Sequence, residues 1–181
     1  MSADKKKKKA LRLWKGEVPE AICQLPQLHL SCFGCCGYEY VSEDKLKKQI
    51  AMNTWRFKKM YTSKEVFAET TIGVTEAGCC KAVIEFEDGT VGCPLHPKKN
   101  EGQDLRTGDC LRNYECNALR HYKKWRRSRK RAFLEHVARG NFNTYSYSMA
   151  NSNSSLIRTF FNAEPETFAS RLKDAFSGDE D

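Results

Sequence analysis

The spacing of apolar residues between positions 42 and 61 predicts an amphipathic helix. The apolar side chains recur at helical spacing: Leu46, Ile50, Phe57 and Tyr61. Ser42 stands immediately before this pattern, and serine is a residue type that caps helix N-termini. We therefore expect a helix over residues 42–60 with one apolar face.

A β-hairpin is predicted over residues 81–93, KAVIEFEDGTVGC. The apolar run VIEF is followed by EDG, which is typical of a turn, and TVGC returns the chain. The turn would bring Cys80 and Cys93, at the two ends of the hairpin, close together. Residues 94–110 contain two prolines and two glycines without periodicity, so we expect a loop that returns Cys110 and Cys116 to the same place.

The C-terminal third is predicted to be mainly helical. Residues 120–136, RHYKKWRRSRKRAFLEH, carry Tyr122, Trp125, Arg129 and Phe133 at spacings of three or four, which predicts one basic helix with an aromatic face. The polar segment 141–155, NFNTYSYSMANSNSS, is predicted to be a loop, and 165–176, PETFASRLKDAF, an amphipathic helix.

The length and composition fit one globular unit of the α+β class. The chain has 181 residues, 40% of them hydrophobic, and no apolar run near the ~20 residues needed to span a bilayer. We predict a basic flexible arm over 1–19, a cysteine-rich metal-binding domain over 20–122, and over 123–181 the basic helix, polar loop and final helix. A soluble, cytoplasmic protein without a membrane partner is expected.

Nine cysteines are a high count for such a chain, and three of them lie within SCFGCCGYEY, residues 31–40. In a reducing compartment, clustered thiols usually ligate a metal or carry redox chemistry. The stretch CFGCC supplies C-x-x-C, a compact source of two ligands for tetrahedral zinc or for an iron–sulfur cluster. Since consecutive side chains usually point apart, Cys35 and Cys36 are expected to have different roles.

The cysteine pattern resembles a known family of zinc- or iron-chelating cysteine-rich domains, whose opening signature is C-x-x-x-C-x-x-C-C. The resemblance covers residues 30–122 and rests on CFGCC, then CKAVIEFEDGTVGCPLHP, then DLRTGDC and YEC. It implies a small domain gathered around zinc or an iron–sulfur cluster such as 4Fe-4S. The ligand positions that it implies are Cys32, Cys35, Cys36, Cys80, Cys93, Cys110 and Cys116.

The chain departs from that family at the first position of the opening cluster, where Leu28 replaces a cysteine. Cys23 lies further upstream than the missing ligand, and neither Cys23 nor Cys79 has a spacing partner. For both we favour burial as small apolar residues. His96 and His121 are further candidate ligands, although His96 in CPLHP is equally consistent with a turn.

Seven of the nine residues from 123 to 131 are basic, and the net charge of the chain is +8. These residues are Lys123, Lys124, Arg126, Arg127, Arg129, Lys130 and Arg131. Clustered cations with interleaved aromatic residues are the footprint expected of a nucleic-acid partner. An acidic protein would also suit this surface, and a solvated basic face without any ligand is the alternative.

Signals for catalysis are weak, so whether the protein is an enzyme stays open. The chain has no G-x-S-x-G elbow, glycine-rich phosphate loop or H-E-x-x-H pair. The sequence therefore predicts a metal-binding protein that holds zinc or an iron–sulfur cluster. The alternatives are a nucleic-acid-binding module in which zinc is a scaffold, and a thiol redox protein.

Overall fold

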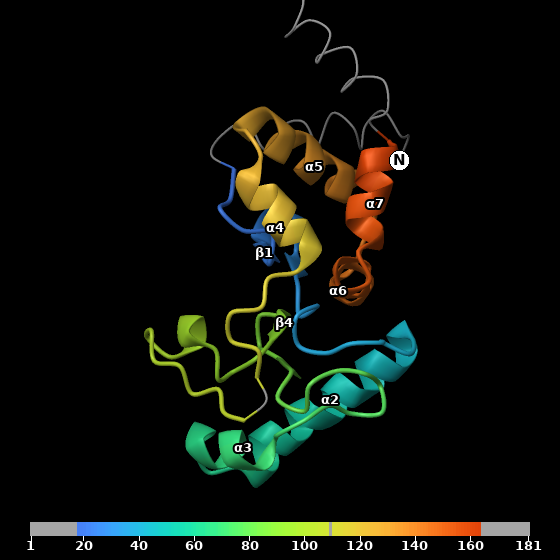
Figure 1. Ribbon diagram of the computed structural model, residues 1–181. Helices are drawn as coiled ribbons and strands as arrows, with labels where there is room; N and C mark the ends of the chain where they lie inside the picture. Colours follow the sequence, from blue (N-terminus) through green and yellow to red (C-terminus); the bar gives the residue numbers. More distant parts are fainter. Residues whose placement is uncertain (1–17, 109, 164–181) are drawn as a thin grey trace, which may run out of the picture.

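The computed structural model describes residues 18–108 and 110–163, and it confirms the predicted α+β class. Within these residues the chain forms six α-helices, two 3-10 helices and two sheets of two strands each. Helices α4 to α7 lie with β1 at one end of the molecule, α2 and α3 lie at the other, and β4 lies between them (Figure 1).

The first sheet is a hairpin that the sequence pattern did not predict. Strands β1 (Gln24–Leu25) and β2 (Leu30–Ser31) pair antiparallel, with Gln24 opposite Ser31, and the 3-10 helix η1 (Pro26–Leu28) joins them. His29 adopts the left-handed conformation that ends η1, with φ of 54°. Each strand has only two residues, which is too short to show periodicity.

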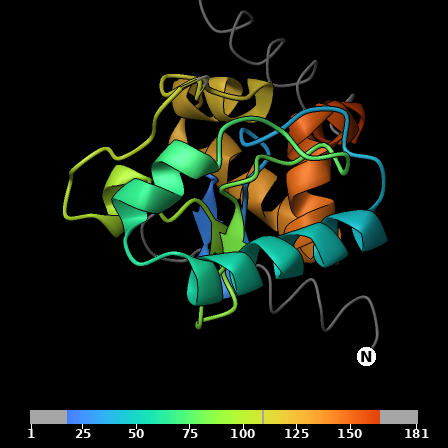
Figure 2. The same ribbon diagram turned by 90° about the horizontal axis from the view of Figure 1, so that it is seen from below.

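Helix α2 (Glu43–Met60) confirms the predicted helix and its cap. The Ser42 hydroxyl accepts a hydrogen bond from the Lys45 amide at 3.3 Å, and Leu46 and Ile50 are buried. The shorter helix α3 (Lys64–Thr70) follows and is capped in the same way by Ser63. In the view from below, α2 runs across the molecule beneath the strands (Figure 2).

The second hairpin is confirmed between β3 (Ile84–Glu85) and β4 (Val91–Gly92). The Asp88 carboxylate closes its turn by accepting a hydrogen bond from the Thr90 amide at 2.9 Å. The Ser31 hydroxyl accepts from the Val91 amide at 2.8 Å, so the two hairpins are joined by a buried bond. The long loop that follows is irregular as predicted, apart from the 3-10 helix η2 (Pro97–Lys99).

The prediction of one continuous helix over 120–136 was wrong. The chain instead forms α4 (Asn117–Lys124) and α5 (Arg127–Arg139), and Trp125 and Arg126 between them have extended backbone, with ψ of 148° and 157°. The break lets α5 fold back, so that the Trp125 ring lies 5.5 Å from Phe133 and 5.2 Å from Phe160. Aromatic packing therefore overrides the local helical pattern here.

The prediction of a loop over 141–155 was also wrong, because this polar segment forms α6 (Thr144–Ser152) and the start of α7 (Ser155–Asn162). A capping box begins α6: the Asn143 side chain accepts from the Ser146 amide, and the Ser146 hydroxyl accepts from the Asn143 amide. The buried Tyr147 hydroxyl donates to the Ile22 carbonyl at 2.8 Å. The polar residues of this segment therefore cap α6 and make buried hydrogen bonds.

Three groups of buried side chains form the interior. The first joins the first hairpin to the C-terminal helices, with Leu25 and Leu30 packed together with Phe133 and Phe160. The second lies around α2 and the CFGCC loop, and the third lies between α3 and the second hairpin. The first hairpin therefore shares one hydrophobic core with helices that lie beyond residue 122.

Two predicted segments fall partly or wholly outside the described residues. Most of the basic arm, 1–17, and the final helix over 165–176 belong to this part of the sequence. Among the helices that the structure does describe, none combines the length and apolar character required to cross a bilayer.

Candidate metal centre

The CFGCC loop leads from β2 toward α2 and is fixed through Phe33, which is buried. The Phe33 amide donates to the Ser148 hydroxyl of α6 at 3.1 Å, and the Phe33 carbonyl accepts from the Cys36 amide at 2.7 Å and the Tyr40 hydroxyl at 3.0 Å. A side chain at Gly34 would lie 2.8 Å from the Ser148 carbonyl oxygen. The loop therefore requires glycine where it passes α6.

Cys35 and Cys36 do not point apart as expected, because their Sγ atoms lie 3.9 Å apart. The Cys35 side chain is exposed and that of Cys36 is half-buried. The hydrogen bond from Cys36, and to a smaller extent the Arg106 charge, lower the pKa of Cys35 to about 7. The same shared bond, followed by burial, raises the pKa of Cys36.

Cys80 is brought to this loop by backbone pairing. The Cys80 amide donates to the Cys36 carbonyl at 2.7 Å, and Gly37 and Cys79 form an isolated antiparallel bridge. A Cβ atom at Gly37 would lie 2.2 Å from the Gly78 carbonyl oxygen, so the two segments approach as closely as only glycine allows. The entry to the second hairpin is therefore anchored on the CFGCC loop.

Several thiols accept a hydrogen bond from a nearby backbone amide. The three N–H···Sγ distances are 3.4 Å each, from Gly34 to Cys32, from Ala82 to Cys80 and from Leu119 to Cys116. The Leu95 amide acts in the same way on Cys93. Amide donors stabilise a thiolate, so these four positions are prepared for a charged sulfur.

Burial opposes the thiolate form at the same positions. It is the largest cause that raises the pKa of Cys93 to about 12, and it also raises the pKa of Cys32, Cys80 and Cys116. A buried thiol without a cation therefore keeps its proton. Metal binding would displace that proton, because the thiolate is the form that ligates.

Cys110 lies at the end of the long loop, before α4. Its side chain is exposed. Nearby, Arg106 makes a bidentate ion pair with Asp104, with both N–O distances 2.8 Å. The loop therefore brings a fixed cation to the cysteine region.

All nine cysteines are free thiols. Of the seven predicted ligands, the structure joins Cys36 to Cys80 by a backbone hydrogen bond and packs Cys80 and Cys93 against one core. Within residues 18–108 and 110–163, no three His, Cys, Asp or Glu side chains are arranged as around a bound metal ion. The metal centre therefore stays a prediction.

Cys23 lies closer to the CFGCC loop than its position in the sequence suggested. The Cys32 amide donates to the Cys23 carbonyl at 2.8 Å, next to the pair Gln24 and Ser31 in the first hairpin. Cys23 therefore lies directly across from the first cysteine of the CFGCC loop. The proline-containing segment PQLH between the two cysteines was the available signal for a turn.

The two candidate histidines have other contacts. The His96 Nδ1 atom accepts from the Lys98 amide at 3.2 Å and caps η2. The His121 ring packs edge-on against Phe161, with 5.4 Å between ring centroids. Cys79 is fully buried, and its Sγ atom lies 3.3 Å from the Thr75 hydroxyl.

The predicted basic residues divide into two groups. Lys123, Lys124, Arg126 and Arg127 are exposed around the break between α4 and α5, and the Lys123 ammonium pairs with Glu115. Arg129, Lys130 and Arg131 are half-buried. The Arg129 guanidinium lies 5.1 Å from the Trp125 ring centre, and the Lys130 ammonium lies 5.2 Å from that of Tyr122.

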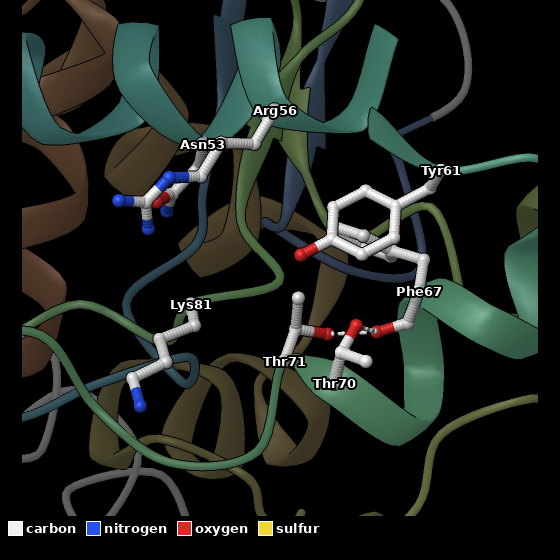
Figure 3. A pocket seen from close by; sticks show the side chains of 7 residues that line it. All are labelled: Asn53, Arg56, Tyr61, Phe67, Thr70, Thr71 and Lys81. Atoms are coloured by element: carbon white, nitrogen blue, oxygen red, sulfur yellow. Dashed lines mark hydrogen bonds between the residues drawn. The ribbon is translucent and has the colours of Figure 1, made fainter. Parts of the chain in front are cut away.

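A small pocket lies between α2, α3 and the entry to the second hairpin (Figure 3). Its lining residues are Asn53, Arg56, Tyr61, Phe67, Thr70, Thr71 and Lys81. The volume is about 40 Å³, which is the space of a few water molecules. This pocket is therefore too small for an organic substrate.

Comparisons with protein-family models, with curated proteins and with solved structures gave no match. The resemblance to zinc- or iron-chelating domains therefore remains a prediction from the cysteine pattern.

Proposed function

We propose that this protein binds metal through its clustered cysteines, as zinc or as an iron–sulfur cluster, in a reducing compartment such as the cytoplasm. The observation that carries the proposal is the meeting of the CFGCC loop with the second hairpin. A backbone hydrogen bond joins Cys36 to Cys80, and Cys80 and Cys93, at the two ends of the hairpin, pack against the same core.

The N–H···Sγ bonds favour ligation over simple apolar packing. A cysteine that serves only as a small apolar residue needs no amide donor, whereas Cys32, Cys80 and Cys116 each accept one. The donors offset part of the cost of burying thiolate charge. A bound cation supplies the remaining stabilisation.

The test is elemental analysis and an ultraviolet–visible spectrum of the full chain purified without oxygen. We expect stoichiometric metal. Iron and sulfide with absorption near ~400 nm would assign an iron–sulfur cluster, and a colourless sample with zinc would assign a thiolate zinc site. A folded sample without metal, in which cysteines form reversible disulfides, would overturn the proposal in favour of a thiol redox protein.

A second candidate function is nucleic-acid binding, in which zinc acts as a scaffold. It is favoured by the four exposed cations around the break between α4 and α5. Neutralising Lys123, Lys124, Arg126 and Arg127 to Gln should lower affinity for a DNA or RNA duplex and flatten its salt dependence, by about 0.9 in slope per lost phosphate contact.

The matched control neutralises four exposed lysines of α2 instead: Lys45, Lys48, Lys58 and Lys59. Equal losses in both variants would show that only net charge matters. No affinity of the native protein for either duplex at low salt would exclude this candidate, and an acidic protein partner would then be the ligand to test at the same surface.

A further inference from the structure

Helix α2 has one face that none of the described helices or strands covers. In the view from below, the helix crosses the near side of the molecule (Figure 2). Its buried residues Leu46 and Ile50 occupy the side that packs against the second core. Trp55 lies nine positions after Leu46, which is about two and a half helical turns, so the two side chains lie on opposite faces. The face around Trp55 is therefore open to solvent.

Two large apolar side chains lie on this open face, about one turn apart. The Trp55 side chain is 53% exposed and that of Met52 is 48% exposed. Tryptophan is enriched among the residues that carry most of the binding energy in protein interfaces. Methionine is flexible and adapts its shape to different partners. The pair therefore has the chemistry of an interface rather than of a solvated helix surface.

Cations stand at both ends of this pair. Lys48 precedes Met52 by four positions and Lys59 follows Trp55 by four, so the four side chains form one stripe along the helix. The helix carries six basic residues, and its two acidic residues both lie in the first turn. Lys48 and Lys59 are exposed and make no ion pair with any described residue. The stripe therefore places exposed positive charge on either side of an apolar centre.

The make-up of the stripe distinguishes between three kinds of partner. A second copy of the chain meeting the same stripe would bring like charges together, which is unfavourable. A single strand of nucleic acid stacks successive bases on aromatic rings, but the stripe offers one ring and the thioether of Met52. A peptide with both carboxylates and apolar side chains satisfies the cations and the apolar centre together.

We propose that the stripe of Lys48, Met52, Trp55 and Lys59 is the docking surface for an acidic amphipathic segment of a partner protein. Apolar side chains of the segment cover Met52 and Trp55, and its carboxylates pair with the two lysines. The inference goes beyond metal binding and does not depend on it. Helix α2 and the helices α4 and α5 lie at opposite ends of the molecule (Figure 1), so this surface is separate from the basic residues between α4 and α5.

The test measures binding of two labelled synthetic peptides to the full chain by fluorescence anisotropy. Both consist of Glu and Leu and are as long as α2. The first has its Leu residues at helical spacing, and the second has the same composition in a scattered order. We expect the first to bind more tightly, with an affinity that falls as salt is added, because the flanking charges are then screened.

Replacing Trp55 by Ala should weaken binding of the first peptide about 10-fold or more, since an interface tryptophan is lost. Leu111→Ala is the matched control, because Leu111 is also an exposed apolar residue but lies between the long loop and α4, and it should leave binding unchanged. Both side chains are exposed, so circular dichroism should show the native fold in both variants.

The charges are tested in the same way. The double variant Lys48→Gln and Lys59→Gln should weaken binding at low salt and reduce its salt dependence. Lys123→Gln with Lys124→Gln removes the same charge at the other end of the molecule and is the matched control. Equal losses in the two double variants would show that only net charge attracts the peptide and would overturn the stripe.

The other outcomes also decide the proposal. Failure of the first peptide to bind, equal binding of the two peptides, or binding that Trp55→Ala leaves unchanged would overturn it. Tighter binding of a labelled oligothymidylate, lost in Trp55→Ala, would assign the stripe to nucleic acid instead. A dimer in sedimentation that Trp55→Ala dissociates would assign it to a second copy. None of these results depends on the metal content, so the proposed metal binding stands or falls separately.

Discussion

At the scale of single residues, buried polar side chains connect the cysteine segments to the helices. The Asn53 amide of α2 donates to the Val83 carbonyl at 3.1 Å, and Ser31 joins the two hairpins. Ser148 of α6 holds the CFGCC loop through the Phe33 amide. These residues fix where the thiols lie, although none of them is a candidate ligand.

Replacing Ser148 by Ala should lower the free energy of unfolding by about 1–3 kcal/mol, because the buried Phe33 amide loses its acceptor. Chemical denaturation followed by circular dichroism measures this change. Ser128→Ala, at an exposed position of α5, is the control and should lie within about 0.5 kcal/mol of the native protein. Equal stability of the two variants would contradict the role of Ser148.

The ion pair between Asp104 and Arg106 predicts a pH dependence. The Arg106 guanidinium holds the pKa of the Asp104 carboxyl well below its usual 3.8, so its contribution to stability is present above about pH 4 and is lost as pH falls further. Asp104→Asn should therefore lower stability at pH 7 by about 1 kcal/mol.

Unfolding measured at pH 7 and at pH 3 tests this prediction. The difference between the native protein and Asp104→Asn should shrink at the lower pH. Glu101→Gln, at an exposed position of the same loop, is the control and should show little difference at either pH. If the difference in unfolding free energy between Asp104→Asn and the native protein grew as pH fell, the prediction would be contradicted.

At the scale of elements, a helix cap connects α6 to α2. Asn143 begins α6 with a capping box, and its side-chain amide donates to the Glu43 carboxylate of α2 at 2.8 Å. The N-terminus of α6 is thereby tied to the N-terminus of α2. The CFGCC loop contacts α6 at Ser148 and leads into α2.

Replacing Asn143 by Ala should cost about 1 kcal/mol of stability, since the cap of α6 is lost. Asn143→Ser keeps a capping oxygen and should recover most of this loss in thermal unfolding. If both variants unfolded at the same temperature, the capping oxygen would not be the cause.

The elements that could be predicted carry local signals. Ser42 and the helical spacing of apolar residues after it predict α2. The turn sequence EDG between two apolar runs predicts the second hairpin. The first hairpin and α6 could not be predicted in this way, because the strands are too short to alternate and α6 buries polar residues. The break at Trp125 could not be predicted locally, because the Trp125 ring packs against Phe160, which lies 35 positions further along the chain.

For the candidate site, the cysteine pattern selected the CFGCC loop and the ends of the second hairpin, and a backbone hydrogen bond joins the loop to Cys80. Cys23 was left out because its proximity to Cys32 arises only through a two-residue strand pair. Pairing of this kind leaves almost no pattern in the sequence.

At the scale of the whole molecule, the CFGCC loop lies between the core shared by the C-terminal helices and the core around α2. Cys32 packs against the first core and Cys36 against the second. Metal bound by thiols from both sides would therefore stabilise the whole chain, and its free energy of binding would add to that of folding.

Metal removal should lower the thermal midpoint. A ligand at about 1,000 times its dissociation constant adds about 4 kcal/mol, which for a chain of this size is a shift of roughly 10 °C. Unfolding of the full chain with and without a chelator, both under reducing conditions, measures the shift. Restoration by added Zn²⁺ is the control, and an unchanged midpoint would show that the metal has no part in folding.

The most direct test of metal binding is the native mass of the full chain purified without oxygen. The account predicts a mass above that of the bare polypeptide by the mass of the bound metal less that of the displaced thiol protons. A folded protein with the mass of the bare polypeptide would contradict it.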